Sequence, residues 1–487
     1  MILLEDRADG SSLPLRRRGR ARRRKYTIVK EILFKCRKSI VSLMKLLLFM
    51  ALMGICFGLL SLHNPQIIKM SRTAAVTGLT FVVCGLFMTH IYGTYDIGKR
   101  KSRPIVHSLT LSVMFTDLLT FVMLIIMNMN EVNNNRMYPY LWEDLLLLLV
   151  ALILQIFCIV LFTYGGHAIY FSFTDPERCL IVTGGGDLRN LRRGIGKYKK
   201  QYKVEGTIEL GDPNLYEAIE KVDTIFLNNV QEDDKNKIVS FCYQHMVNVF
   251  YTPEVVDVVN LHSRLAVLDD VSMIASEVKE LSFEQRLIKR TMDIVVSMIG
   301  LIILSPILLI CAAAIKIGDG GTVLFRQNRV TEGGRIFTIY KFRTMIEHAD
   351  QHLVTDHDSR ITKVGHFLRK YRLDELPQLL NILKGDMSLV GPRPEMTEYV
   401  YVYSETLPEF LYRHRVKAGL TGYAQITGKY NTSSKDKLVM DLMYIESFSI
   451  WNDVKILFQT VLVLLRADES TAAFDDDEEA KRRGESE

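Results

Sequence analysis

One short stretch decides what the C-terminal half of the chain can be: Leu373-Asp374-Glu375-Leu376-Pro377-Gln378-Leu379-Leu380-Asn381-Ile382-Leu383. Its leucines recur at helical spacing, and proline is common in the first turn of a helix, so we expect a helix that begins close to Asp374 and Glu375. Asp374 could simply cap that helix. Alternatively, the two adjacent acids could hold a divalent metal while one carboxylate attacks phosphorus. The stretch alone leaves both interpretations open.

Basic residues surround this acid pair in the sequence. Upstream, strand-like runs over 325–345 predict a hairpin with cations at its strand ends, and a basic segment over 360–372 follows it. Downstream, a loop rich in glycine and proline over 384–395 places an acid and an arginine where a ligand could reach them. Clustered arginines suit phosphate oxygens, although a solvated basic surface would have the same composition. Attack on a diphosphate would also require Mg²⁺ and the helix dipole to offset the repulsion between anions.

An apolar segment, Ile294–Ile315, opens this half and is long enough to cross a bilayer. Ser305-Pro306 lies in its middle, and proline bends or breaks a helix because it lacks an amide hydrogen and clashes with the preceding turn. Cations flank the segment on both sides, which favours a helix that enters and leaves the same leaflet. We expect such a re-entrant helix over 291–316; a kinked spanning helix is the alternative that composition leaves open.

The preceding hundred residues alternate between strand-like and helical patterns, which predicts a small parallel sheet. Strands are expected at Cys179–Thr183, Val204–Leu210, Val222–Leu227 and Val247–Tyr251, with a basic helix over Leu188–Gln201. A turn of three glycines and Asp187 follows the first strand. It is not a full dinucleotide fingerprint, because Arg189 stands where the last glycine would be. We therefore expect a Rossmann-like module used for assembly or regulation rather than for binding a dinucleotide.

Four further apolar stretches predict a transmembrane bundle: Leu46–Leu62, Thr73–Tyr95, Ile105–Asn128 and Leu145–Gly166. The N-terminal arm and the loop at Asp96–Pro104 are basic, so the positive-inside rule puts both ends of the bundle in the cytoplasm. Asp117 interrupts the third stretch, and one isolated acid favours a structural or assembly role over a transport pathway.

The charge of the chain is concentrated at its ends. Its 487 residues carry a net charge of +6 and are 48% hydrophobic. Residues 1–40 hold thirteen Lys or Arg and four Asp or Glu, whereas residues 468–487 hold three basic and nine acidic residues. This distribution argues against a nucleic-acid partner and predicts an arm that sets orientation and meets anionic membrane lipid. Seven scattered cysteines predict neither a metal site nor a disulfide framework.

Five motifs, in order, give the segment from about Phe283 to Arg466 a specific resemblance. It resembles the bacterial sugar transferases, that is, the polyprenyl-phosphate phosphoglycosyl transferases. The motifs are Lys289-Arg290-x-x-Asp293, Ser305-Pro306, Lys341-Phe342-Arg343-Thr344-Met345, Leu373-Asp374-Glu375-Leu376-Pro377-Gln378 and Gly385-Asp386-Met387-Ser388-x-Val390-Gly391-Pro392-Arg393-Pro394. The four apolar stretches and the Rossmann-like module that precede these motifs are similar to the arrangement in the large members of the family. Those members are of the undecaprenyl-phosphate galactose or glucose phosphotransferase type. Ala418 stands where many members have proline and Lys429 where arginine is common, which puts the sugar in doubt more than the reaction.

The resemblance implies Mg²⁺-dependent transfer of a sugar-1-phosphate from a UDP-sugar to polyprenyl phosphate, usually undecaprenyl phosphate, with release of UMP. This reaction starts exopolysaccharide, capsule or O-antigen assembly. The resemblance implies a covalent phospho-sugar intermediate on Asp374, with Glu375 binding Mg²⁺ or orienting the nucleophile. Candidates for contacts with phosphate are Arg343, Arg393, Lys341, Arg326, Arg369 and Arg372, and candidates for supporting groups are Asp386 and Glu395.

We therefore expect an α-helical membrane bundle plus α/β: four transmembrane helices, a Rossmann-like middle module and a monotopic α/β catalytic domain on a re-entrant helix. The expected ranges are a basic arm at 1–40, the bundle at 41–170, the module at 171–280, the catalytic domain at 281–467 and an acidic tail at 468–487. We expect a multi-pass protein of the bacterial inner (plasma) membrane, with its catalytic domain in the cytoplasm, assembled as a homo-oligomer, a dimer.

Two alternatives belong to other functional classes. One is a membrane scaffold or regulator of polysaccharide assembly whose catalytic-like domain is inert, and the intact acid pair counts against it. The other is an NAD-dependent epimerase or reductase built on the middle module, and the incomplete glycine fingerprint counts against that.

Overall fold

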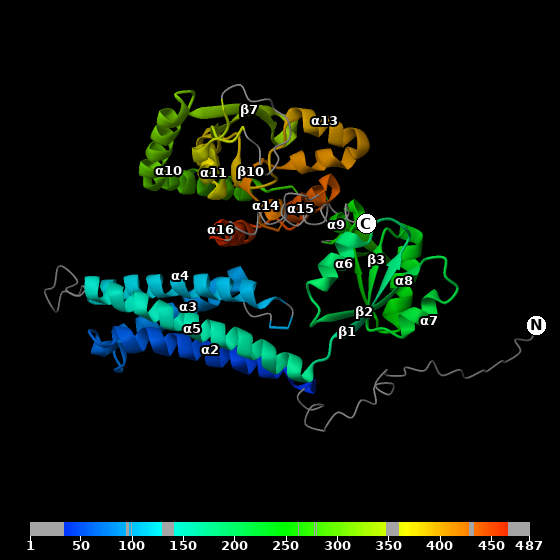
Figure 1. Ribbon diagram of the computed structural model, residues 1–487, viewed down its shortest axis with the longest axis horizontal. Coiled ribbons are helices and arrows are strands. Elements are labelled where there is room, and N and C mark those ends of the chain that lie inside the picture. Colours follow the sequence, from blue (N-terminus) through cyan, green and yellow to red (C-terminus); the bar gives the residue numbers. More distant parts are fainter. Residues whose placement is uncertain are drawn as a thin grey trace, which may run out of the picture.

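A computed structural model provides the structure, which describes residues 34–93, 97–98, 100–128, 141–261, 263–276, 278, 280–346, 360–427 and 433–465. Figure 1 shows three parts: a bundle of long helices, a small α/β unit beyond one end of the bundle, and a larger α/β unit alongside it. The predicted basic arm lies almost wholly outside the described residues, and the acidic tail lies outside them entirely.

The bundle consists of four long apolar helices: α2 (Arg37–Leu60), α3 (Arg72–Tyr92), α4 (Ser102–Asn128) and α5 (Leu141–Phe173). A 3₁₀ turn, η1 (Pro65–Ile67), links the first two. The four predicted apolar stretches are thus helical. The outward faces of these helices remain apolar and exposed, as expected for side chains that meet lipid instead of water.

Polar side chains face inward within the bundle. Asp117 on α4 is buried. Gln155 on α5 donates through Nε2 to Oδ1 of Asp117 (3.4 Å) and to the carbonyl of Leu52 (3.1 Å). At one end of the bundle, Asp144 accepts hydrogen bonds from His63 (2.7 Å) and Asn64 (2.8 Å). The described contacts of Asp117 are therefore between helices, in keeping with the structural role expected for it.

The smaller α/β unit contains a four-stranded parallel sheet with strand order β2-β1-β3-β4. The strands are β1 (Glu177–Thr183), β2 (Tyr202–Glu209), β3 (Thr224–Asn228) and β4 (Asn248–Tyr251), so the predicted parallel sheet is confirmed. The helices of this unit are α6 (Arg189–Gly196), α7 (Leu215–Glu220), α8 (Glu232–Gln244) and α9 (Val255–Asn260). The basic helix is shorter than predicted and ends at Gly196. An antiparallel hairpin, β5 (Arg264–Leu268) and β6 (Val271–Ala275), was not predicted.

Helix α10 (Phe283–Asp319) follows and contains Pro306. It is the fifth described helix that is long and apolar enough to cross a membrane. Next to this proline, the Ser305 hydroxyl donates to the carbonyl of Ile302 (2.8 Å), a side-chain bond to the helix backbone of the kind that often bends helices. Figure 1 shows α10 as two segments that meet at an angle, although its helical structure is continuous from Phe283 to Asp319.

The larger α/β unit begins with the predicted hairpin, β7 (Leu324–Val330) and β8 (Ile336–Phe342), joined through η3 (Glu332–Gly334). A second pair, β9 (Ser388–Val390) and β10 (Gly419–Thr421), is parallel. The remaining elements are α11 (Lys363–Lys370), η4 (Leu373–Gln378), α12 (Leu379–Lys384), α13 (Thr397–Thr406), η5 (Pro408–Arg415), α14 (Tyr423–Thr427), α15 (Ser434–Glu446) and α16 (Ile450–Leu465). One apolar core joins these elements, and its members include Ile339, Ile382, Val390, Phe410 and Leu442.

The amphipathic helix α16 connects this unit to the bundle (Figure 1). Phe458 packs edge-to-face against Tyr92 and Phe115, while Trp451 stacks on His90. Gln459 donates to the carbonyl of Ile91 (3.1 Å). The unit therefore contacts the C-terminal end of α3 and the middle of α4 through α16.

Candidate functional site

Asp374 and Glu375 lie in a 3₁₀ turn rather than in the first turn of an α-helix. The turn, η4, is preceded by Arg372 in the left-handed conformation (φ 53°), and the amide of Glu375 donates to the carbonyl of Arg372 (3.3 Å). The α-helix, α12, begins only at Leu379, and no side chain caps either element. The prediction that the α-helix begins at the acid pair was therefore wrong by one short turn, and Asp374 does not cap it.

Glu375 is clamped by two cations. Its Oε1 accepts hydrogen bonds from Nζ of Lys341 (3.0 Å) and from Nη2 of Arg393 (2.9 Å). Burial alone would raise the pKa of Glu375, but the Arg393 guanidinium and the Lys341 ammonium hold that pKa well below its usual range. Glu375 therefore stays ionised and fixes both cations beside its neighbour.

Asp374 has a different environment. In the part of the chain that the structure describes, no hydrogen bond to its carboxylate is found, so both oxygens are available to a ligand. Burial, followed by the negative charge of Glu375, raises the pKa of Asp374 to about 6. Two adjacent carboxylates with pKa values driven apart are typical of groups with separate chemical roles.

A small cavity of about 10 Å³ lies beside the clamp, and it is lined by Arg329, Ile339, Lys341, Gln378, Arg393, Pro394 and Gly419. Three of these seven residues are cationic, so the cavity suits an anion. Arg329 was not among the predicted residues. Its guanidinium donates to the carbonyl of Pro394 (3.1 Å) and to Gln327 (2.7 Å), and burial together with Arg393 lowers the pKa of Arg329 to about 10.

The alternation of side chains along the hairpin explains why Arg329 was missed. Arg329 pairs with Phe337 and lies on the same face as Ile339 and Lys341, toward the core. Arg326 pairs with Tyr340 on the opposite face, where its guanidinium lies 5.8 Å from the Tyr340 ring centre. The two-residue period of Phe337, Ile339 and Lys341 was the signal that could have distinguished the two arginines.

The other predicted residues make separate contacts, and of these only Arg369 acts electrostatically on Asp374 among the interactions described. Arg369 donates from Nε to the hydroxyl of Thr344 (2.8 Å), and its charge lowers the pKa of Asp374 in opposition to burial. Arg343 is buried with its guanidinium packed on Gly321, and Arg372 forms the left-handed bend before Asp374. Asp386 pairs with Arg335 (3.0 Å), away from the acid pair.

Glu395 belongs to a buried cluster behind the clamp. Arg413, only 2% exposed, donates to the carbonyl of Arg393 (2.7 Å) and pairs with Asp441 (2.7 Å), and Glu395 lies 3.8 Å from Arg413 and 3.7 Å from Lys437. Burial raises the pKa of Asp441 to about 6 despite its pairing with Arg413. The cluster thus holds the backbone of the loop that carries Arg393.

The motif at the start of α10 ties that helix to the same loop. Lys289 donates to Asp453 (2.5 Å), to the Tyr444 hydroxyl (3.2 Å) and to the carbonyl of Val390 (3.0 Å). Asp293 accepts from the amide of Leu389 (2.9 Å), and Arg290 donates to two carbonyls at the end of α12. These hydrogen bonds therefore join the start of α10 to α12 and to the loop that carries Arg393.

The described protein groups supply only some of the ligands that a divalent metal would need at this site. Among the described residues there is no cluster of three His, Cys, Asp or Glu side chains that could enclose an ion. Mg²⁺ is commonly bound by one or two carboxylates together with substrate phosphates, and the unpaired oxygens of Asp374 beside Glu375 suit that mode.

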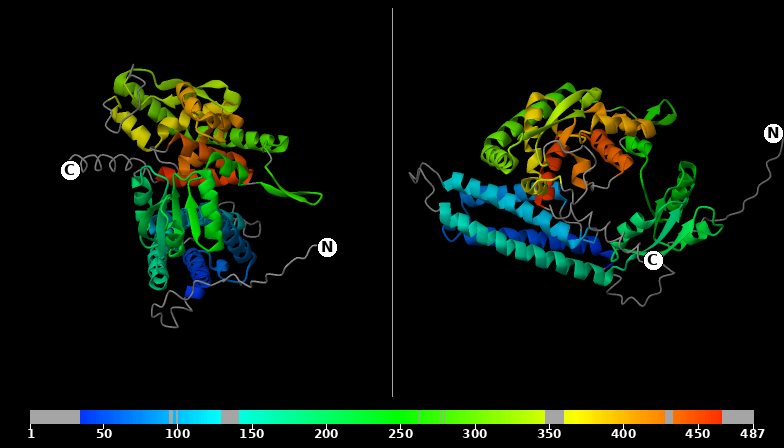
Figure 2. Two further views of the ribbon diagram at one scale, coloured as in Figure 1. Left: turned by 90° about the vertical axis from the view of Figure 1, so that its right-hand side faces the viewer. Right: turned by 45° about the horizontal axis from the view of Figure 1, so that its top comes forward.

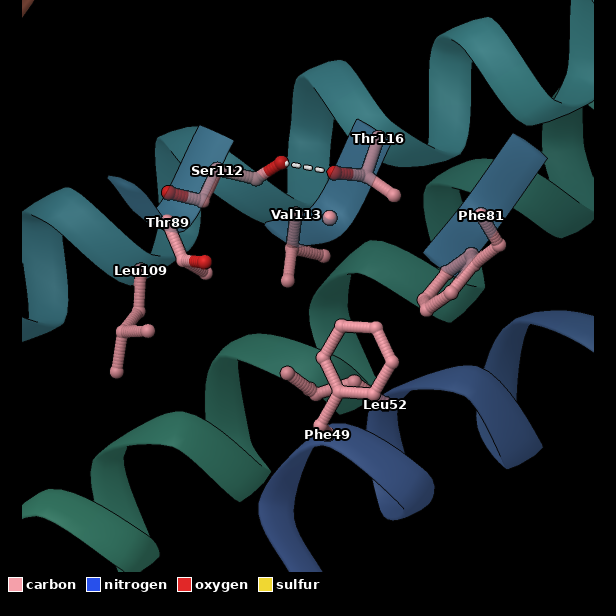
Figure 3. Close-up of a pocket in the computed structure, with 9 residues that line it drawn as sticks. Phe49, Leu52, Phe81, Thr89, Leu109, Ser112, Val113 and Thr116 are labelled. Carbon is pink, nitrogen blue, oxygen red and sulfur yellow. Dashed lines mark hydrogen bonds between the residues drawn. The ribbon is translucent and has the colours of Figure 1, made fainter. Parts of the chain in front are cut away.

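A second hollow lies within the bundle and carries no ionisable group. It is lined by residues of α2, α3 and α4, and Figure 3 shows Phe49, Phe81, Leu109 and Val113 around it, with the Thr116 hydroxyl donating to the carbonyl of Ser112 (2.7 Å). Its polar side chains are the hydroxyls of Thr89, Ser112 and Thr116, and no acid or base lines the hollow to activate them, so the acid pair remains the candidate active site.

The sequence of this site has clear relatives among known proteins. A family model described as "Bacterial sugar transferase" matches residues 284–467. The chain is 42% identical over 188 residues to a UDP-glucose:undecaprenyl-phosphate glucose-1-phosphate transferase of Caulobacter vibrioides, covering 37% of this chain and 70% of the relative. The chain belongs to the bacterial sugar transferase family.

Two longer relatives are similar over the same region. A UDP-N-acetylgalactosamine-undecaprenyl-phosphate N-acetylgalactosaminephosphotransferase of Aeromonas hydrophila is 45% identical over 184 residues (37% of this chain, 44% of the relative). A UDP-glucose:undecaprenyl-phosphate glucose-1-phosphate transferase of Escherichia coli K12 is 40% identical over 222 residues (44% of this chain, 48% of the relative). The chain thus spans about half the length of each of these relatives.

Proposed function

We propose that this protein transfers a sugar-1-phosphate from a UDP-sugar to undecaprenyl phosphate, as the first membrane step in the synthesis of a bacterial polysaccharide. One observation carries the proposal: Glu375 is neutralised by Lys341 and Arg393, whereas Asp374 beside it has free oxygens in the field of the same two cations, which also line a small cavity. This arrangement supports a nucleophilic carboxylate facing a diphosphate. The three relatives are named as transferases that act on undecaprenyl phosphate, which supports the same substrate classes.

The proposed reaction has two displacements at one phosphorus atom. First, an oxygen of Asp374 attacks the phosphorus that bears the sugar, and the bond to the bridging oxygen breaks, so that UMP leaves with the bonding electrons. The sugar phosphate remains bound to Asp374 as an acyl phosphate, a mixed anhydride. In the second step, an oxygen of undecaprenyl phosphate attacks that phosphorus and displaces the Asp374 carboxylate.

The side chains around Asp374 make these steps feasible. Arg329, Lys341 and Arg393 line the cavity and offset the repulsion between the carboxylate and the diphosphate. Glu375 holds Lys341 and Arg393 in place without competing as a nucleophile, because both cations occupy its Oε1. We propose that Asp374 and Glu375 hold Mg²⁺ together with the substrate phosphates; when bound, the ion would neutralise charge on the diphosphate and on departing UMP.

The membrane arrangement follows from the same reaction. We propose that α2 to α5 span the bacterial inner membrane, while α10 is re-entrant and both of its ends lie at the cytoplasmic surface. Two features support a re-entrant α10. Pro306 lies within the helix, and cations lie on both sides of its apolar part, since Lys289 and Arg290 precede that part and Lys316 follows it. Both the soluble donor and the lipid phosphate would then reach Asp374. We further propose that the protein acts as a dimer.

The test is detection of the covalent phospho-sugar. Full-length protein is incubated with a panel of UDP-sugars and Mg²⁺ but no lipid acceptor, and intact-protein mass spectrometry measures the added mass. The wild type and a matched Asp234→Asn control should gain one phospho-sugar, while Asp374→Asn should gain none. A wild type that forms no adduct and releases no UMP with any donor would instead support an inert scaffold.

A further inference from the structure

A second charged surface lies outside the active site, where the smaller α/β unit meets the membrane helices. Residues 189–203 contain seven Lys or Arg and no Asp or Glu. They form α6 and the turn that leads to β2. We propose that this segment and the adjacent start of α4 form a binding surface for anionic phospholipid headgroups.

Three contacts place the segment at the end of the spanning helices. Gln201 donates to the carbonyl of Gly98 (2.8 Å), in the loop between α3 and α4. Nζ of Lys101 lies 5.2 Å from the Tyr198 ring centre, and Nζ of Lys200 lies 5.8 Å from that of Phe171 at the end of α5. Figure 1 shows α6 on the side of the sheet toward the bundle, with α7 and α8 on the far side. Figure 2 shows this α/β unit at one end of the bundle.

The cations of this surface are exposed and mostly uncompensated. We define the juxtamembrane basic surface by five exposed residues: Lys101, Arg103, Arg193, Lys199 and Lys200. Within the described part of the chain, none of these five pairs with an acid. Another cation of the segment, Arg189, pairs with Asp187 (2.9 Å) and is not counted. A solvated surface that only kept the unit soluble would normally mix both signs of charge.

The position of the surface favours lipid over a soluble anion. It is continuous with the apolar ends of α4 and α5, where the headgroups of a bilayer would lie if these helices span it. Tyr198, 38% exposed, adds an aromatic side chain of the type found at membrane interfaces. Clusters of Lys and Arg next to a membrane span attract anionic lipid, so a phosphatidylglycerol-like headgroup fits both the charge and the depth.

Native mass spectrometry of the full-length protein tests the proposal. Protein in a neutral detergent is titrated with dioleoylphosphatidylglycerol or with dioleoylphosphatidylcholine, and the lipid-bound fractions are compared. The wild type should retain phosphatidylglycerol in preference to phosphatidylcholine. The variant Lys199→Gln/Lys200→Gln should weaken phosphatidylglycerol binding by about 25-fold, because each lysine near an anionic surface contributes roughly five-fold.

Two matched variants keep the experiment decisive. Lys221→Gln/Lys237→Gln removes the same charge from the C-terminal end of α7 and from α8 on the far side, and it should bind as the wild type does. Lys199→Arg/Lys200→Arg should retain binding, which excludes a folding defect as the cause of the loss. Equal loss in the far-side variant, no loss in Lys199→Gln/Lys200→Gln, or displacement of the lipid by inorganic phosphate at equal concentration would overturn the proposal.

Discussion

Arg413 offers the sharpest test of how the site is built, because the same side chain stabilises the fold and holds the active-site loop. It pairs with Asp441, which is 1% exposed, and donates to the carbonyl of Arg393. Arg413→Met keeps the side-chain length but leaves a buried carboxylate without its cation. Breaking a buried pair in this way costs about 3–5 kcal/mol, which predicts a fall of roughly 6–20 °C in the apparent melting temperature of a domain of this size.

A double variant separates stability from positioning. Arg413→Met/Asp441→Leu removes both charges, so most of the lost stability should return. Activity should not return with it, since the Arg393 carbonyl still lacks its charged donor. A hydrogen bond from a charged group contributes about 1.5–3 kcal/mol, so if the loop relaxes, the UMP-release rate should stay at least about 10-fold below that of the wild type.

The assays are thermal unfolding in detergent, followed by intrinsic fluorescence, and UMP release with kcat and KM determined separately. Loss of positioning should lower kcat more than it raises KM. Arg413→Lys, which preserves the charge, should recover part of both stability and activity. The reasoning fails if Arg413→Met melts as the wild type does, or if the double variant recovers full activity.

Three further predictions concern the acid pair, the cavity and the membrane helix. Because the carboxylate form of Asp374 is the nucleophile and its pKa is raised to about 6, adduct formation in single-turnover experiments should fall about 10-fold per pH unit below 6 and level off above it; a rate that is flat from pH 5 to 8 would contradict this. Arg329→Gln should lower kcat/KM by at least about 10-fold, whereas Arg326→Gln on the outer face of the hairpin should change it less than about 2-fold, as measured by UMP release; equal effects would show that the cavity does not bind the donor. Lys289→Met should lower the apparent melting temperature as Arg413→Met does, since it leaves Asp453 fully buried without its cation, and an unchanged melting curve would argue against a rigid link between α10 and the site.

Local patterns in the sequence predicted those elements whose cause is local. The apolar stretches, the parallel sheet and the β7–β8 hairpin follow from hydrophobic periodicity and from turn residues, and all are present in the structure. The start of α12 was misplaced because Arg372 adopts a left-handed conformation that only the surrounding structure imposes. The β5–β6 hairpin was missed because its apolar residues are exposed, which removes the alternation that normally marks a strand.

Groups that act across long distances in sequence could not be placed from the sequence. The spacing of Lys289, Arg290 and Asp293 indicates one region of a helix, but their partners lie about 100 to 160 residues further on. Arg413 was missed because arginine is rarely buried unless paired, and its partner Asp441 has no local pattern. The clamp on Glu375 was expected only as a group of candidate cations; the structure selects Lys341 and Arg393 from that group.

The contact between α16 and the bundle bears on where catalysis can occur. Trp451, Phe458 and Gln459 contact the end of α3 and the middle of α4. In the membrane arrangement proposed above, these contacts help to set the position of the active site along the membrane normal, together with α10. Two independent attachments restrict tilting in a way that one anchor cannot. The lipid phosphate must then reach the depth of Asp374 in the membrane. Bilayer thickness would therefore affect which lipid substrates present their phosphate at that depth.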